Sequence, residues 1–182
     1  MRELQPPFTA EEEAALREAL RGGDVMSYPT ETFYALGGNA LNPALVEAVY
    51  RLKQRPPDKA LLLLVDGRTI AELVAEVPQT ARLLMAACWP GPLTLVFRAG
   101  PALPEHLRCN DGTELGTGHG TGLGTVALRW SPHPVVQRLL ALGGVPLIGT
   151  SANLSGHPPT HTWAEVRAAF PSAIALGADD GP

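Results

Sequence analysis

The feature that most constrains the fold is a series of short apolar runs separated by helical patterns. The run ALLLLV at residues 60–65 is continuous rather than alternating, which is typical of a strand covered on both faces. Similar runs predict further strands at 25–29, 93–97, 125–130 and 145–150. Helical patterns at 10–21, after Asn42-Pro43, and at 78–88 lie between them.

Strands that alternate with helices predict an α/β domain with a twisted mixed sheet flanked by helices. A chain of 182 residues with 45% hydrophobic residues can bury one sizeable core, so we expect a single domain over 1–182. Capping boxes at Thr9 with Glu12 and at Thr162 with Glu165 predict two helix starts. The segments TETFYALGG and 109–124 are predicted to be loops.

Charge and composition limit the possible partners. The formal net charge is -4 and no block of consecutive basic residues occurs, which disfavours a broad nucleic-acid footprint but leaves room for a local basic cleft. No apolar run approaches the roughly 20 residues of a membrane helix, and the amino terminus lacks a signal-like apolar region. We therefore expect a cytoplasmic protein without a membrane contact. The two cysteines and the His157/His161 pair do not predict a metal site held by the protein.

The stretch RLKQRPPDKALLLLV contains the only two lysines of the chain, Lys53 and Lys59, with Arg55 between them. Basic residues are favoured at the carboxyl end of a helix, and the prolines would stop that helix, so the cluster has a purely structural interpretation. The functional interpretation is that the three cations converge on a polyanion such as a triphosphate.

Two polar loops follow predicted strands, at the place where open α/β sheets usually bind ligands. In PTET, Thr30 and Thr32 could bind a small polar ligand and Glu31 could meet an ammonium group, although loop threonines often bond their own backbone. In GTSANLSG, Ser151 and Asn153 have the character of ligand-lining residues. Neither a P-loop nor a nucleophile elbow is present.

Taken together, the motifs resemble a known family. SYPTETFYALGGNA, LKQRPPDKALLLLV, WPGPLTLVF, TVALRWSPHP and TSANLSGHPPT occur in the order and spacing of the YrdC/TsaC family of threonylcarbamoyl-AMP synthases, within the YrdC/YciO superfamily. The resemblance covers about residues 10–170. It implies a YrdC-like α/β fold with a deep basic cavity.

The resemblance also implies an activity. Members of this family are nucleotidyltransferases that make L-threonylcarbamoyladenylate from L-threonine, bicarbonate and ATP. The product serves the t6A modification of adenosine 37 in tRNA, together with proteins of the TsaD, TsaB and TsaE type. Mg²⁺ is expected to enter through ATP rather than in a carboxylate cage.

Residue roles follow from matching the motifs. Lys53 and Arg55 match the family's Lys-x-Arg pair and are expected to act catalytically by electrostatic stabilisation, with no covalent nucleophile. Thr32 and Arg129 match threonine-binding positions. The expected ATP-binding residues are Lys53, Arg55, Lys59, Thr125, Ser151 and Asn153.

Three features depart from the family pattern. Ala35 replaces a common glycine and would crowd the backbone if its φ were positive. Leu64 replaces a histidine that contacts threonine, and the chain ends at DDGP before a Ser-Thr-Val-Val-Asp segment. The alternative function is therefore a YciO-like paralogue that binds RNA or nucleotide without making threonylcarbamoyl-AMP. A carbamoyl-adenylate domain of the HypF type is a third interpretation, disfavoured because its accompanying segments are missing.

Overall fold

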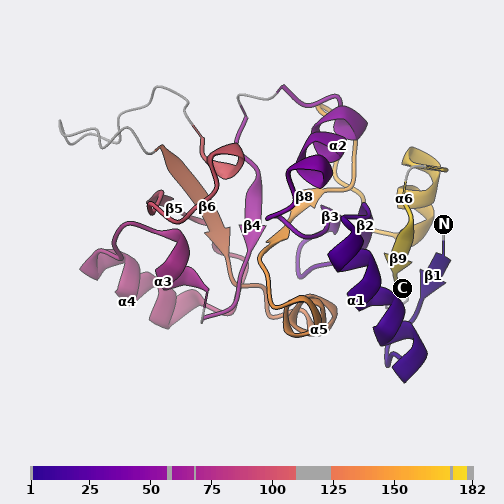
Figure 1. The fold of residues 1–182 in the computed structure, drawn as a ribbon, viewed down its shortest axis with the longest axis horizontal. Coiled ribbons are helices and arrows are strands. Elements are labelled where there is room, and N and C mark those ends of the chain that lie inside the picture. The colour runs from indigo at the N-terminus through magenta and orange to yellow at the C-terminus, as the bar shows by residue number, and fades with distance from the viewer. Residues whose placement is uncertain (1, 57–58, 68, 110–123, 173, 180–182) are drawn as a thin grey trace.

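The computed structural model describes residues 2–56, 59–67, 69–109, 124–172 and 174–179. Within these residues the strands form two mixed sheets that lie side by side in Figure 1. Sheet A has the order β1-β9-β2-β3-β8, with bounds Arg2–Leu4, Leu176–Ala178, Met26–Pro29, Tyr34–Gly37 and Thr150–Ser151. Sheet B has the order β5-β6-β4-β7, with bounds Leu95–Arg98, Thr125–Arg129, Leu62–Leu64 and Leu147–Ile148.

Six α-helices surround the sheets in the described residues. They are α1 (Ala10–Gly22), α2 (Pro43–Lys53), α3 (Ile70–Leu73), α4 (Gln79–Cys88), α5 (Pro134–Gly143) and α6 (Trp163–Ala169), with a short 3-10 helix at Glu105–Leu107. The α/β class is therefore confirmed. No described helix is long and apolar enough to cross a membrane.

Local sequence chemistry explains where the helices begin. Both predicted capping boxes are present, at the starts of α1 and α6. The Asn42 side chain caps α2 by accepting from the backbone N–H groups of Ala44 and Leu45, with proline at the first helical position. The apolar faces of α1 and α5 pack against sheet A, where Leu16, Leu139 and Tyr28 are fully buried.

The prediction of a single sheet was wrong because the run at 145–150 divides into two strands. β7 pairs with β4 in sheet B, whereas β8 pairs with β3 in sheet A, and only Gly149 lies between them. A Cβ at Gly149 would lie 2.6–3.1 Å from the Leu64 side chain, so glycine permits the close approach at this crossing. The crossing connects the two sheets by one continuous stretch of chain.

The second wrong prediction was that TETFYALGG is entirely a loop. Tyr34–Gly37 forms β3, which is antiparallel to β2, so the loop is confined to 30–33. α5 begins at Pro134, with His133 as its cap. β1 was not expected. The predicted glycine-rich loop lies mostly outside the described residues, in 110–123.

Candidate functional site

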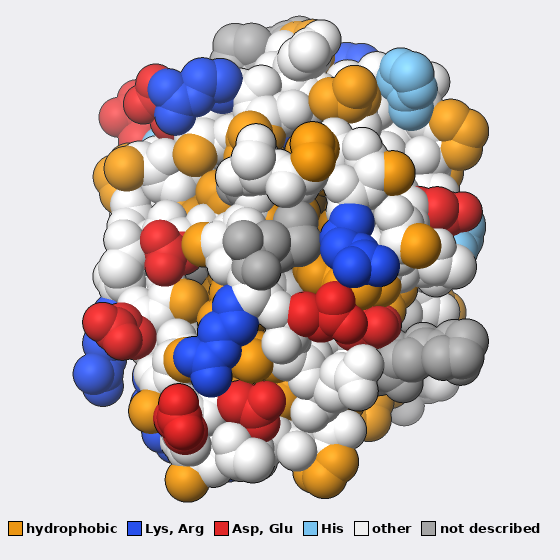
Figure 2. Space-filling model, turned by 90° about the vertical axis from the view of Figure 1, so that its right-hand side faces the viewer, with side chains coloured by type: hydrophobic (Ala, Val, Ile, Leu, Met, Phe, Trp, Pro, Cys, Tyr) orange, Lys and Arg blue, Asp and Glu red, His pale blue; other side chains and the backbone are white. Residues whose placement is uncertain are grey.

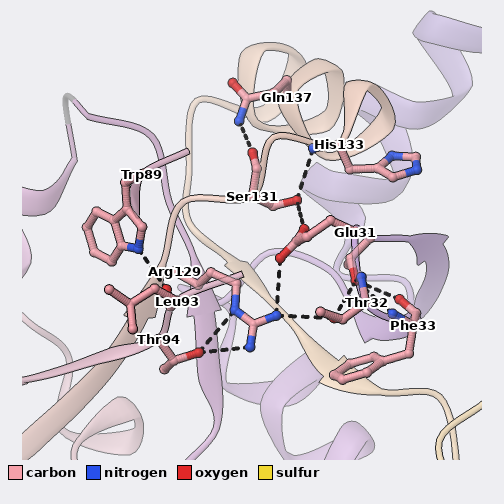
Figure 3. A network of polar contacts seen from close by, with 11 residues as sticks. Glu31, Thr32, Phe33, Trp89, Leu93, Thr94, Arg129, Ser131, His133 and Gln137 are labelled. Carbon is pink, nitrogen blue, oxygen red and sulfur yellow. Dashed lines mark hydrogen bonds and ion pairs between the residues drawn. The ribbon is translucent and has the colours of Figure 1, made fainter. Parts of the chain in front are cut away.

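Arg129 is the centre of a polar network at the junction of the two sheets, shown in Figure 3. It ends β6, and its side chain is 13% exposed. Its Nε and Nη2 donate to the Thr94 hydroxyl at 3.0 and 2.9 Å. Nη1 donates to Glu31 Oε1 and to the Thr32 hydroxyl, both at 3.2 Å. Four of its five N–H groups thus have partners, and among the described residues the second N–H of Nη2 has none.

Glu31 uses both carboxylate oxygens inside this network. Oε1 accepts from Arg129, and Oε2 accepts from the buried Ser131 hydroxyl. Ser131 Oγ also accepts from the His133 backbone N–H at 3.2 Å, and the Ser131 carbonyl accepts from Gln137 Nε2 at 2.5 Å. The ion pair therefore connects the β2–β3 loop of sheet A to the end of β6 in sheet B.

The two threonines of the PTET loop have different roles. Thr30 Oγ1 accepts from the backbone N–H groups of Thr32 and Phe33 and donates to the Phe33 carbonyl, so Thr30 stabilises the turn itself. Thr32 Oγ1 accepts from the Arg129 guanidinium and also lies 3.1 Å from Thr30 Oγ1. The structure thus brings together Thr32 and Arg129, the two predicted threonine-binding residues.

Lys53, Ser151 and Asn153 form a second cluster. Lys53 is the last residue of α2 and is only 2% exposed. Its ammonium donates to the Ser151 carbonyl, to the Asn153 carbonyl at 2.7 Å and to Asn153 Oδ1 at 3.1 Å. Ser151 Oγ also donates to Asn153 Oδ1 at 2.5 Å. The Lys-x-Arg and Ser-x-Asn motifs therefore meet, and Lys53 holds the loop that carries Ser151 and Asn153.

The environment of Lys53 also changes its acidity. Burial, followed by the nearby positive charge of Arg55, lowers the pKa of Lys53 from 10.5 to about 8. The side chain is consequently still mostly protonated at neutral pH. Three oxygen acceptors match the three N–H donors of an ammonium group, whereas a neutral amine has only two.

The three cations of the KQRPPDK stretch differ in exposure. Arg55 is half-buried and donates from Nη2 to the Ala60 carbonyl at 2.7 Å, while Lys59 is exposed. The Lys59 carbonyl accepts from the Tyr50 hydroxyl at 2.9 Å. Arg55 thus braces the loop after α2. The assignment of all three cations to ATP stays a prediction.

Thr125 and Arg129 lie at the two ends of β6. Residues 125, 127 and 129 are partly exposed and alternate with buried residues, so they share the open face of the strand. Four residues of extended chain separate Thr125 from Arg129 by roughly 13 Å. The predicted nucleotide contact and amino-acid contact thus lie along one strand face.

Two departures from the family pattern can be located. Ala35 is fully buried in β3, opposite Ser151. Its φ is not positive, because Gln54 is the only non-glycine residue with a positive φ in the described chain. Ala35 thus has ordinary strand geometry and causes no backbone strain. Leu64 is 1% exposed, pairs with Arg129 and Leu147, and packs against Gly149. It belongs to the core and offers no hydrogen bond to a ligand.

The predicted deep basic cavity stays a prediction. A hollow of about 390 Å³ lies between α6 and the loop that begins at Asn153, and its lining includes His157, Thr160 and Glu165. Figure 2 shows the face at the α6 and β1 end of the molecule, where basic and acidic side chains are interspersed. That distribution does not favour a broad nucleic-acid footprint on this face.

Sequence reasoning missed two members of the Arg129 network. Thr94 lies in the WPGPLTLVF motif and Ser131 in TVALRWSPHP, but neither was assigned a role. Glu31 was expected to meet an ammonium group, and the structure places it on Arg129 and Ser131. The available signal was that Thr94 and Ser131 are polar residues close to the ends of predicted strands, where ligand-binding residues of α/β sheets are often found.

Comparison with known proteins gives consistent matches. The family model Sua5_yciO_yrdC, described as telomere recombination, matches residues 18–182. A threonylcarbamoyl-AMP synthase of Bacillus subtilis is 36% identical over 97% of this chain and 47% of its own length. A protein of that name from Chromohalobacter salexigens is 38% identical over 92% of this chain and 85% of its own length.

A solved structure agrees with these matches. The crystal structure of P. abyssi Sua5 complexed with L-threonine has a TM-score of 0.85 and 29% identity, over 99% of this chain and 50% of that chain. The present chain thus spans about half the length of some of its relatives and most of the length of others. With its matching motifs and fold, the chain belongs to the Sua5/YciO/YrdC family.

Proposed function

We propose that the protein is an L-threonylcarbamoyladenylate synthase, a nucleotidyltransferase that uses L-threonine, bicarbonate and ATP. The observation that carries the proposal is the largely buried Arg129 guanidinium with the Thr32 hydroxyl beside it. A guanidinium is suited to a carboxylate, and a hydroxyl beside it can accept or donate to the same ligand. The relatives' name and the L-threonine bound to the P. abyssi protein support this assignment.

The proposed reaction has two bond-forming steps. The threonine amine attacks carbon dioxide derived from bicarbonate and loses a proton, which gives a carbamate. A carbamate oxygen then attacks the α-phosphorus of ATP, and the bond from that phosphorus to the pyrophosphate oxygen breaks. Arg129 and Thr32 would bind the amino-acid carboxylate and thereby hold the threonine amine in an orientation suited to its attack on carbon dioxide.

The phosphates of ATP also need positively charged partners. Arg55 offers a planar fork and Lys59 a movable point charge for phosphate oxygens. Lys53 adds its charge from behind the loop that carries Ser151 and Asn153. Thr125, Ser151 and Asn153 would complete the ATP contacts. Mg²⁺ is proposed to arrive with ATP, bound by phosphate oxygens.

The proposal extends to the cellular setting. Threonylcarbamoyl-AMP is a mixed anhydride that must be consumed by a transfer reaction. We propose that proteins of the TsaD, TsaB and TsaE type use it on adenosine 37 of tRNA, in the cytoplasm. A direct RNA contact would be local, since the net charge is -4.

The test is a pyrophosphate-release assay with ATP, Mg²⁺, bicarbonate and L-threonine, with mass spectrometry of the adenylate. Arg129→Ala should raise the KM for threonine at least about 30-fold, because it removes the largely buried guanidinium that is proposed to pair with the threonine carboxylate. Arg167→Ala is the matched control, because Arg167 is exposed and lies 3.9 Å from Glu3 on another part of the surface. Absence of a threonine-dependent product at high enzyme concentration refutes the proposal.

A further inference from the structure

Ser131 is completely buried, and its polar groups have fixed partners. Its hydroxyl donates to Glu31 Oε2 and accepts from the His133 backbone N–H. Its carbonyl accepts from Gln137 Nε2, a side chain of the first turns of α5. Figure 3 shows this connected path from α5 through Ser131 to Glu31 and Arg129. The hydroxyl direction is therefore set from two sides.

The Ser131 contact determines how Glu31 can meet Arg129. Glu31 and Arg129 are each 13% exposed, so water can replace a lost partner only in part. With Oε2 fixed by Ser131, Oε1 is directed at Nη1. Without that bond, the carboxylate can rotate about its terminal torsion, which is intrinsically soft.

Arg129 is thus held on two edges by different residues. Thr94 takes Nε and Nη2, whereas Glu31 and Thr32 take Nη1. Thr94 alone would leave the guanidinium free to tilt at Nη1. A ligand carboxylate depends on that plane, because the orientation of the guanidinium sets the direction of the remaining Nη2 N–H, the donor left for the ligand.

We propose that Ser131 is a positioning residue for the amino-acid carboxylate: it acts through Glu31 to set the plane of the Arg129 guanidinium. The ligand in this statement rests on the proposed function. The orientation of Arg129 rests on the contacts alone, so the two can be tested separately.

The binding test uses Ser131→Ala with Ser27→Ala as its matched control. Ser27 is also fully buried and donates one hydrogen bond, to the Ala35 carbonyl at 2.9 Å, but it does not contact Arg129. Calorimetry on the whole chain should show roughly ten-fold weaker L-threonine binding for Ser131→Ala, the size expected for a lost bond to a charged group. ATP binding should change less than about two-fold, and Ser27→Ala should alter neither.

The route through Glu31 is tested by repeating Ser131→Ala in a Glu31→Gln background. If Ser131 acts through the carboxylate, most of its effect disappears there, because contacting residues are not additive. An undiminished effect in that background overturns the proposed route. Equal weakening of ATP and threonine binding, or equal behaviour of Ser131→Ala and Ser27→Ala, overturns the positioning role.

A second readout does not depend on threonine. The Arg129 Nε–H signal can be assigned in nitrogen-15 NMR spectra by its loss in Arg129→Lys. Ser131→Ala should shift this signal and accelerate its exchange with solvent, whereas Ser27→Ala should not. If the wild-type protein does not bind threonine but this signal responds, the proposed function fails and the positioning role stands. An unchanged signal overturns the positioning role.

Discussion

The buried ammonium of Lys53 leads to a prediction about stability and pH. Burial and the Arg55 charge lower its pKa to about 8 from an ordinary value of 10.5. Between these two values, the unfolded chain keeps the proton while the folded chain releases it. Stability rises with pH wherever the unfolded state binds more protons, so Lys53 should make the protein more stable as the pH rises from about 8 to 10.5.

The size of this effect follows from the same two values. At 1.36 kcal/mol per pH unit, the full change is about 3 kcal/mol. Measurements are best limited to the range from about pH 7 to pH 9.5, where tyrosines of the unfolded chain are still mostly protonated. Within that range, the contribution of Lys53 to the free energy of unfolding should increase by about 2 kcal/mol.

Urea unfolding of the wild type and of Lys53→Met measures this contribution. The wild-type value minus the Lys53→Met value should increase with pH by the stated amount. Lys59→Met is the control, since Lys59 is exposed and, within the described residues, it makes its hydrogen bonds through its backbone N–H and carbonyl. A pH-independent difference between wild type and Lys53→Met would refute the reasoning, and so would a difference that falls as the pH rises.

Two further predictions concern the site and sheet A. Thr94→Val keeps the shape of the side chain but removes the acceptor of Arg129 Nε and Nη2, so calorimetry should show roughly ten-fold weaker threonine binding with ATP binding unchanged; equal losses for both ligands would contradict this. Ala35→Gly should lower the free energy of unfolding by about 1–2 kcal/mol, because it removes a buried methyl group and loosens a strand. Unchanged or higher stability in urea unfolding would show that the glycine common in the family suits this position better.

Much of the fold was predictable because local chemistry and pattern agree. The capping boxes at Thr9 and Thr162 and the cap at Asn42 specify helix starts through short-range hydrogen bonds. The division of the run at 145–150 was not predictable in this way. It depends on the close approach of Leu64 to Gly149, which are far apart in the sequence. β3 was missed because its four residues carry little signal without their partner strand β2.

The sequence predicted which motif residues lie together, but it gave Thr94 and Ser131 no role and did not predict the individual contacts. The motifs placed Thr32 beside Arg129, and Lys53 beside Ser151 and Asn153, as the structure has them. The direction of the Lys53 ammonium, toward carbonyl oxygens of the adjacent loop, could not be predicted. It depends on the burial of the end of α2, which is a property of tertiary packing.

The arrangement of sheet A has a consequence for synthesis of the chain. β9 lies between β1 and β2, so this sheet is incomplete until residues 176–178 have left the ribosome. All strands of sheet B lie within residues 62–148 and emerge earlier. Domains commonly fold from the amino-terminal side during synthesis, at about 5–20 residues per second. Here, however, the sheet that contains β1 cannot be completed before β9 has been synthesised. The ion pair between Glu31 and Arg129 therefore joins a late-completed sheet to an early one.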